Sequence, residues 1–192
     1  DDLVYGGLGD DSIDGGHGVD TLYGDEGNDE ISGGSSGDTL YGGEGEDVIY
    51  GDRVRADKGD AGVAGDDLMY GGTGEDRIYG DAGNDTAFGG AGNDEIYGGT
   101  GDDLLTGGRG NDEVFGGADS DTIFGAAGDT VDGGSAGVDY DTLDLTGQGE
   151  FILTGPDGTG EPVEDSNGNG LDGRVIFVDA DGEPTGETID FT

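Results

Sequence analysis

Aspartates recur along this chain at one fixed position of a nine-residue phrase, GGxGxDxUx, in which U is a large aliphatic residue. Clean copies are Gly6–Asp14, Gly42–Tyr50, Gly89–Tyr97 and Gly107–Phe115. Position six of the phrase holds Asp2, Asp11, Asp20, Asp29, Asp38, Asp47, Asp67, Asp76, Asp85, Asp94, Asp103, Asp112, Asp121, Asp129 and Asp141. Position five varies among Asp, Val, Asn, Gly and Glu. Turn propensity alone does not require Asp at one position of nine, so position six indicates a ligand.

The chemistry that these residue types favour is calcium ligation. Calcium takes six to eight oxygen ligands from carboxylates and backbone carbonyls, and a glycine-rich turn that ends in Asp offers both. The predicted carbonyl donors are the glycines at positions two and four: Gly7, Gly9, Gly16, Gly18, Gly27, Gly43, Gly45, Gly72, Gly74, Gly83, Gly90, Gly92, Gly99, Gly101, Gly108 and Gly110. The phrase therefore predicts multiple calcium ions as the cofactor.

The elements that must position these ligands are turns and very short strands. Paired glycines allow positive φ and a tight turn, and the closing x-U-x triplet carries β-formers such as Thr21-Leu22-Tyr23. In a strand, U points to one face and its neighbours to the other. Successive repeats then lie on opposite sides of a thin core, and one coil spans two repeats. The sequence predicts an all-β chain, a right-handed parallel β-roll of nonapeptide repeats with a small C-terminal β cap.

Two repeats per coil place stacked turns 18 residues apart, which is the spacing between successive position-six aspartates on one edge, such as Asp2, Asp20 and Asp38. Ions shared between adjacent turns would neutralise charge and join coil to coil, so that ligation and folding become one event.

Composition indicates the same need for cations. The chain has 47 acidic and six basic residues, a formal net charge of −41, 49 glycines and 30% hydrophobic residues. Self-repulsion of this size opposes a compact state. It also excludes nucleic acid as a partner and disfavours an anionic membrane surface. The chain has no cysteine, and no apolar run approaches a membrane span, so we expect no membrane insertion.

Two regions interrupt the phrase. We expect residues 1–145 to form the roll, with an inserted loop at about 51–66 that carries Arg53, Arg55 and Lys58 and leaves the stack in register. A surface loop is favoured there over a partner site. Residues 146–192 lose the period and are expected to form the capping segment, with a hairpin turn at Asp181-Gly182.

Other candidate chemistry is weak. Asp165–Gly170 matches the first half of an EF-hand loop, but Ile176 stands where its bidentate Glu belongs, so an Asx-rich turn is favoured over a calcium site. His17 is expected to be a solvated loop residue, and GxSxG matches at Gly33–Gly37 and Gly133–Gly137 lack the strand-to-helix context of a hydrolase. We identify no catalytic constellation and predict no enzyme activity.

Aromatic residues at position nine are expected to form a ladder on the outer face of each sheet. One ladder contains Tyr5, Tyr23, Tyr41, Tyr70, Phe88 and Phe124, and the other Tyr50, Tyr79, Tyr97 and Phe115. Mutual stacking is the favoured interpretation. The alternative is an adhesive stripe that binds polysaccharide or a partner protein.

The repeats resemble the RTX, or haemolysin-type calcium-binding, region of exported bacterial proteases, lipases, toxins, adhesins and alginate epimerases. The resemblance covers about three quarters of the chain. It implies type I secretion, with repeats that stay unfolded in the cytosol and fold in extracellular calcium. We therefore expect a calcium-binding folding module, in a monomeric segment of a larger secreted protein.

Overall fold

The computed structural model describes residues 1–52, 64–136, 142–144, 150–154, 163–164, 171–178 and 184–191, with side chains through residue 134 and at 142–143. Every regular element in these ranges is a strand, as the all-β prediction requires. The described part of the chain contains no helix that is long and apolar enough to cross a membrane.

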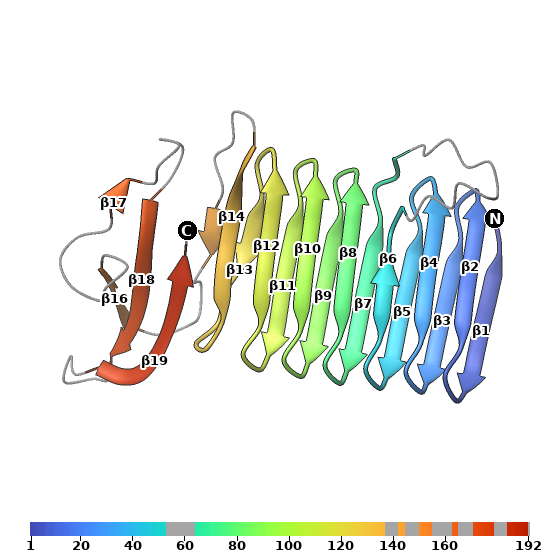
Figure 1. The fold of residues 1–192 in the computed structure, drawn as a ribbon, viewed down its shortest axis with the longest axis horizontal. Coiled ribbons are helices and arrows are strands. Elements are labelled where there is room, and N and C mark those ends of the chain that lie inside the picture. Colours follow the sequence, from blue (N-terminus) through green and yellow to red (C-terminus); the bar gives the residue numbers. More distant parts are fainter. Residues whose placement is uncertain are drawn as a thin grey trace.

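The strands form two sheets between which the chain alternates (Figure 1). The first sheet has the order β1 (Leu3–Leu8), β3 (Thr21–Glu26), β5 (Thr39–Glu44), β7 (Leu68–Thr73), β9 (Thr86–Ala91), β11 (Leu104–Arg109), β13 (Thr122–Phe124) and β15 (Thr142–Asp144). The second begins with β2 (Ser12–His17), β4 (Glu30–Ser35), β6 (Val48–Tyr50), β8 (Arg77–Ala82), β10 (Glu95–Thr100), β12 (Glu113–Ala118) and β14 (Thr130–Ala136). All neighbours in these two series are parallel. The right-handed parallel β-roll predicted from the phrase is therefore confirmed.

The register of the sheets follows the doubled period of the sequence. Leu22 pairs with Val4 on one side and with Leu40 on the other. Across the insertion Thr39 pairs with Leu68, and the spacing of 29 residues there replaces the usual 18. The stack thus continues past the insertion in register, as predicted. Arg53, Arg55 and Lys58 lie outside the described residues.

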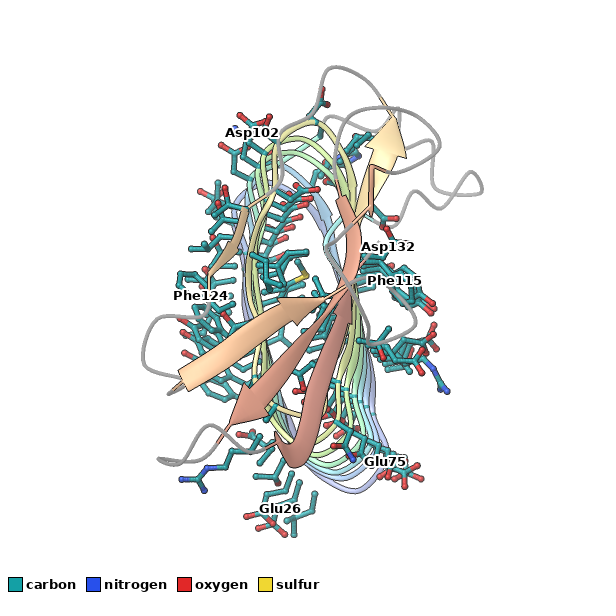
Figure 2. All side chains as sticks on the ribbon, turned by 90° about the vertical axis from the view of Figure 1, so that its left-hand side faces the viewer. Glu26, Glu75, Asp102, Phe115, Phe124 and Asp132 are labelled. Atoms are coloured by element: carbon teal, nitrogen blue, oxygen red, sulfur yellow. The ribbon has the colours of Figure 1, made fainter. Side chains whose placement is uncertain are left out.

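The interior of the roll is one row of U side chains from each sheet. These residues are at most 6% exposed: Ile13, Leu22, Ile31, Leu40, Ile49, Met69, Ile78, Ala87, Ile96, Leu105, Val114, Ile123 and Val131. Their neighbours in the strands face outward, as in β10, where Ile96 is buried between the half-buried Glu95 and Tyr97. Figure 2, which shows the stack from its end, displays the narrow space that these side chains fill. The core is one side chain deep per strand.

The aromatic residues stack along the outer faces. Rings of Tyr5, Tyr23, Tyr41, Tyr70 and Phe88 follow one another with centroids 4.6–5.0 Å apart and planes within 9°. Tyr50, Tyr79, Tyr97 and Phe115 do the same on the other face, at 4.8–5.0 Å and within 11°. The predicted stacking is confirmed for these rings. Phe124 is separated from Phe88 by Thr106, which occupies the intervening strand. Phe115 and Phe124 mark the two opposite faces in Figure 2.

The last strands extend the second sheet beyond β14. There β19 (Pro184–Phe191) pairs parallel to β14, and β18 (Leu171–Val178) pairs antiparallel to β19. The predicted hairpin strands therefore pair with each other. The sheet ends with β16 (Glu150–Thr154), and β17 (Val163–Glu164) pairs with β18 off the main path. The order places this segment at the end of the roll, where a cap would act; its role as a cap stays a prediction. Asp141, Asp165–Gly170 and the turn at Asp181-Gly182 lie outside the described residues.

The shallow core gives a direct test of the fold through two adjacent leucines in β11. Leu105 is fully buried, whereas Leu104 is 37% exposed. We expect Leu105→Ala to reduce the free energy of unfolding by about 2–5 kcal/mol, and Leu104→Ala to reduce it much less, when both are measured by urea denaturation in excess calcium. Equal losses for the two variants would contradict the assigned register.

Candidate metal centre

The position-six aspartates lie in the turns that lead into the strands, and the fold buries them. From Asp20 to Asp129, each of these side chains is at most 2% exposed. Asp2 is exposed and Asp11 is partly exposed in the first coil. Water therefore does not solvate most of these carboxylates, and burying a charge is costly unless another group compensates for it.

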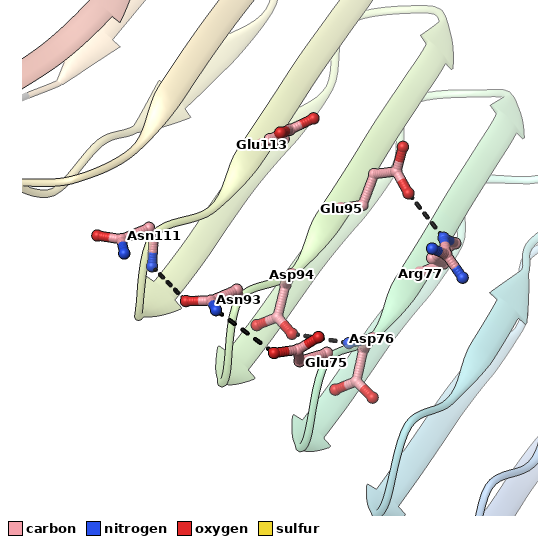
Figure 3. Close-up of a pocket in the computed structure, with 8 residues that line it drawn as sticks. All are labelled: Glu75, Asp76, Arg77, Asn93, Asp94, Glu95, Asn111 and Glu113. Atoms are coloured by element: carbon pink, nitrogen blue, oxygen red, sulfur yellow. Dashed lines mark hydrogen bonds and ion pairs between the residues drawn. The ribbon is translucent and has the colours of Figure 1, made fainter.

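One oxygen of each buried carboxylate joins a ladder that runs along the stack. The backbone N–H of Asp76 donates to Oδ1 of Asp94 at 2.9 Å, and the N–H of Asp94 donates to Oδ1 of Asp112 at 3.0 Å. The first of these bonds is drawn in Figure 3. The same bond crosses the insertion, from Asp38 N–H to Asp67 Oδ1 at 2.6 Å. From Asp2 to Asp129, the structure thus brings each predicted aspartate beside the one in the next turn on its edge of the roll.

In most of these carboxylates the second oxygen makes no hydrogen bond; Asp129 is the exception, since its Oδ2 accepts the N–H of Ala126 at 2.7 Å. Buried Oδ2 atoms without any hydrogen bond belong to Asp11, Asp20, Asp29, Asp38, Asp47, Asp67, Asp76, Asp85, Asp94, Asp103, Asp112 and Asp121. A buried polar atom that makes no hydrogen bond costs about 1–3 kcal/mol, and more when it is charged. A repeated set of such atoms indicates that a component which binds anionic oxygen belongs between the turns.

Glycine at position one leaves room beside each unpartnered oxygen. A Cβ on Gly6 would lie 2.6 Å from Asp11 Oδ2 and 2.8 Å from the carbonyl oxygen of Gly24 in the next turn. At Gly15 the corresponding distances are 2.5 Å to Asp20 Oδ2 and 2.7 Å to the carbonyl oxygen of Gly33. The absence of a side chain therefore leaves a small space, here called the cradle. It is bordered by a carboxylate oxygen of one turn and by a carbonyl oxygen of the next turn.

These position-one carbonyls were not among the predicted donors. A signal for them is present in the sequence, because position one is glycine in every copy from Gly6 to Gly116, whereas position two also accepts Asp25 and Asp81. Position one accepts only glycine, whereas position two accepts Asp. This difference indicates that space for a side chain is lacking at position one, in addition to any requirement of the turn geometry.

The glycines predicted as carbonyl donors form the turns themselves. Every one of them has positive φ. Position-four N–H groups donate to position-three carbonyls of the next turn, for example Gly74 to Ala91 and Gly92 to Arg109, both at 2.9 Å. The Gly92 carbonyl is directed at Gly110 in the next turn. The predicted carbonyls thus lie at the contact between turns, and their role as ligands stays a prediction.

A second ladder at position five was missed by sequence reasoning. Oδ1 of Asp66 accepts the N–H of Asn84 at 2.8 Å, and Oδ1 of Asn84 accepts the N–H of Asp102 at 2.9 Å. These bonds run opposite to those at position six and lie on the exposed side of the turn. Asp and Asn both carry a side-chain oxygen at Oδ1. The frequent occurrence of these two residues at position five could therefore have indicated the ladder from the sequence.

Burial sets the electrostatics of the centre. It raises the pKa of Asp85 to about 8, and that of Asp38, Asp67 and Asp76 to about 7, with repulsion between stacked carboxylates adding to the effect. Arg77 does not compensate for these charges, because its guanidinium bonds Glu95 at 2.7 Å on the outer face, as Figure 3 shows.

The donor set fits calcium. In the described residues, no group of three or more Asp, Glu, His or Cys side chains converges on one point. An ion between two turns would therefore be held by position-six carboxylates together with backbone carbonyls. An all-oxygen set of this kind matches the preference of calcium, and cysteine is absent from the chain.

Fold and site together define a parallel β-solenoid with oxygen-lined centres between its turns, the class of calcium-binding repeat proteins. The chain matches the RTX calcium-binding nonapeptide repeat family in four copies, at residues 1–31, 23–54, 61–96 and 97–132. These copies cover more than half of the chain, which belongs to this family. No curated protein matches the sequence.

The unpartnered oxygens predict a specific effect of Asp94→Asn. The amide oxygen can still accept the N–H of Asp76, but the anionic Oδ2 is lost. We expect calcium affinity at this centre to fall by about tenfold or more, since affinity follows ligand charge, in calorimetric titrations of the whole chain. Asp102→Asn, an exposed position-five change that keeps its acceptor for Ser120 N–H, is the matched control. Equal effects of the two variants would count against position six as the ligand.

The raised pKa values predict how pH acts on the metal-depleted chain. Because burial raises the pKa of these aspartates above the unfolded value of about 4, the folded state binds protons more tightly than the unfolded state. Their contribution to stability is complete below about pH 4 and is lost as pH rises through the folded pKa values of about 6 to 8. Circular dichroism should therefore show β-structure increasing from pH 8 to pH 4. More β-structure at pH 8 than at pH 5 would contradict this sign.

Proposed function

We propose that this chain is a calcium-dependent folding and stability module of a secreted protein, disordered without calcium and folded as a β-roll when calcium binds between its turns. The observation that carries the proposal is the repeated row of buried Oδ2 atoms that have no hydrogen-bond partner. RTX repeats bind calcium as a family. The proposal adds that ligation drives folding, and that the position-six aspartates and turn carbonyls are the ligands.

The energetics of the chain support this coupling. Each repeat buries only one U side chain, so apolar burial is small compared with the backbone entropy that is lost when its nine residues become ordered. The net charge of −41 further opposes compaction. Divalent cations between the turns would offset both the charge and the missing apolar stabilisation. A site that does not exist in the unfolded chain makes binding free energy into folding free energy.

The proposed dependence on calcium also favours an extracellular location. RTX repeats are typical of proteins exported by type I systems, so the family supports secretion. A chain that lacks cysteine depends on no redox environment for disulfides. Folding that waits for calcium would keep such a chain unfolded before export and ordered after it.

A contact between a histidine and a serine in the described residues gives little support to a catalytic role. His17 Nδ1 lies 2.9 Å from the hydroxyl of Ser35, the serine of a GxSxG match. Ser35 is only 6% exposed, and the contact joins two stacked strands, β2 and β4. The pair thus links adjacent coils and does not present a nucleophile to solvent.

The aromatic ladders also support a structural module over an adhesive one. Ring faces within each ladder cover one another at 4.6–5.0 Å, so the interior rings direct only their edges to solvent. Sugar rings bind aromatic residues through the ring face. Stacking therefore uses the surface that a polysaccharide would need.

Calcium titration of the metal-depleted chain tests the proposal. At neutral pH we expect a coil-like circular dichroism spectrum that converts to a β spectrum as calcium is added and reverts with EDTA. Magnesium is the control cation, because its demand for octahedral geometry and retained water makes it a poor substitute in such a site. A metal-free chain that is already folded at low ionic strength would refute calcium-driven folding.

A further inference from the structure

The turn that carries the insertion is assembled from two separate pieces of chain. We call it the interrupted turn: Gly51 and Asp52 before the insertion, and Gly65–Asp67 after it. Asp67 occupies position six in the stack, since its Oδ1 accepts the N–H of Asp38 at 2.6 Å and its own N–H donates to Asp85 Oδ1 at 2.8 Å. Gly51 keeps position one, with its carbonyl accepting the N–H of Gly34 at 2.8 Å. Both pieces therefore hold their regular places.

Asp52 bridges the two pieces at position two. Its Oδ2 accepts the N–H of Gly65 at 2.9 Å, across the gap where the insertion leaves the roll. The side chain is only 5% exposed, and its Oδ1 is buried without a hydrogen-bond partner. Asp25, at position two of an uninterrupted turn, is exposed instead. Asp52 thus repeats the feature of the position-six aspartates: one oxygen is bonded to backbone and the other is unpaired.

The carboxylate of Asp52 lies near that of Asp67. A Cβ on Gly51, the residue next to Asp52, would contact Asp67 Oδ2 and the carbonyl oxygen of Gly80, so these atoms border the cradle of the interrupted turn. Burial is the main cause of the raised pKa of Asp67 and of Asp85, and the charge of Asp52 raises both further. Asp52 therefore lies close enough to Asp67 and Asp85 for its charge to raise the pKa of both carboxyls.

We propose that Asp52 is an additional carboxylate ligand of the divalent cation held at Asp67, a role that the repeat phrase does not give to position two. The inference rests on the proposed function, because it assumes that calcium binds between the turns. Its basis is the unpartnered, buried Oδ1 beside a centre that already contains an unpartnered Asp67 Oδ2. One more anionic ligand raises calcium affinity. This centre then fills at lower calcium than its neighbours, and the ion fastens both ends of the insertion to the roll.

Two substitutions separate ligation from simple bridging. Asp52→Asn keeps an oxygen that can accept the Gly65 N–H but removes the charge, whereas Asp52→Ala removes both. Asp25→Asn removes an equal charge from position two of an uninterrupted turn and is the matched control. The measurement is native mass spectrometry of the whole chain at limiting calcium, together with calorimetric titration with calcium alone. Circular dichroism in excess calcium verifies that each variant folds.

We expect Asp52→Asn and Asp52→Ala to weaken one calcium ion by about tenfold or more, so that one fewer ion is bound at limiting calcium, while Asp25→Asn binds as the unmodified chain does. An Asp52→Asn variant that retains full affinity, with or without a defect in Asp52→Ala, would overturn the ligand role. An unmodified chain that binds no calcium would instead refute the proposed function. The two failures are therefore distinguishable.

Discussion

The burial of a column of carboxylates along each edge of the roll is the constraint on which the rest of the structure depends. From Asp20 to Asp129, each position-six aspartate uses Oδ1 to accept a backbone N–H of the preceding coil, and its carboxylate is buried, as for Asp94 and Asp112. The column then contains more negative charge than the protein compensates for, and Oδ2 remains unpaired. In the proposed scheme, protein groups bond one oxygen of these carboxylates and a cation would bond the other.

Each of the other positions of the phrase has its own structural role in the roll. Position one must be glycine because Oδ2 of the aspartate and a carbonyl oxygen occupy the space of a side chain, as at Gly6. Positions two and four accept positive φ, mostly through glycine, although Asp25, Asp81, Ser36 and Asp119 adopt it as well. Position five adds an exposed ladder, position eight fills the core, and position nine stacks rings on the outer face. Turns and strands both form hydrogen bonds with the neighbouring coil, so stability accumulates along the stack.

Irregularities in the repeat spacing show which contacts between coils are kept. At the insertion the spacing becomes 29 residues and near Asp129 it becomes 17, yet the aspartate ladder persists through both. Between Asp52 and Gly65 a side-chain bond takes the place of the chain that normally links positions two and four. At the far end β19 pairs with β14 and continues the sheet with a strand that follows no repeat. Changes in chain length are thus absorbed at the turns, while contacts between coils are kept.

Spacing in the sequence determined the β-roll, its doubled period, the buried U residues and the aspartates that stack, because a strict repeat forces equivalent residues into equivalent places. The tertiary structure alone decided how polar atoms are directed within each turn. The carbonyls at Gly24 and Gly33 beside the carboxylates, the ladder through Asp66 and Asn84, and the bridge from Asp52 to Gly65 all depend on which way a peptide group or side-chain oxygen faces. Residue spacing specifies which residues meet, but the backbone dihedral angles of the folded turn set which of their atoms do.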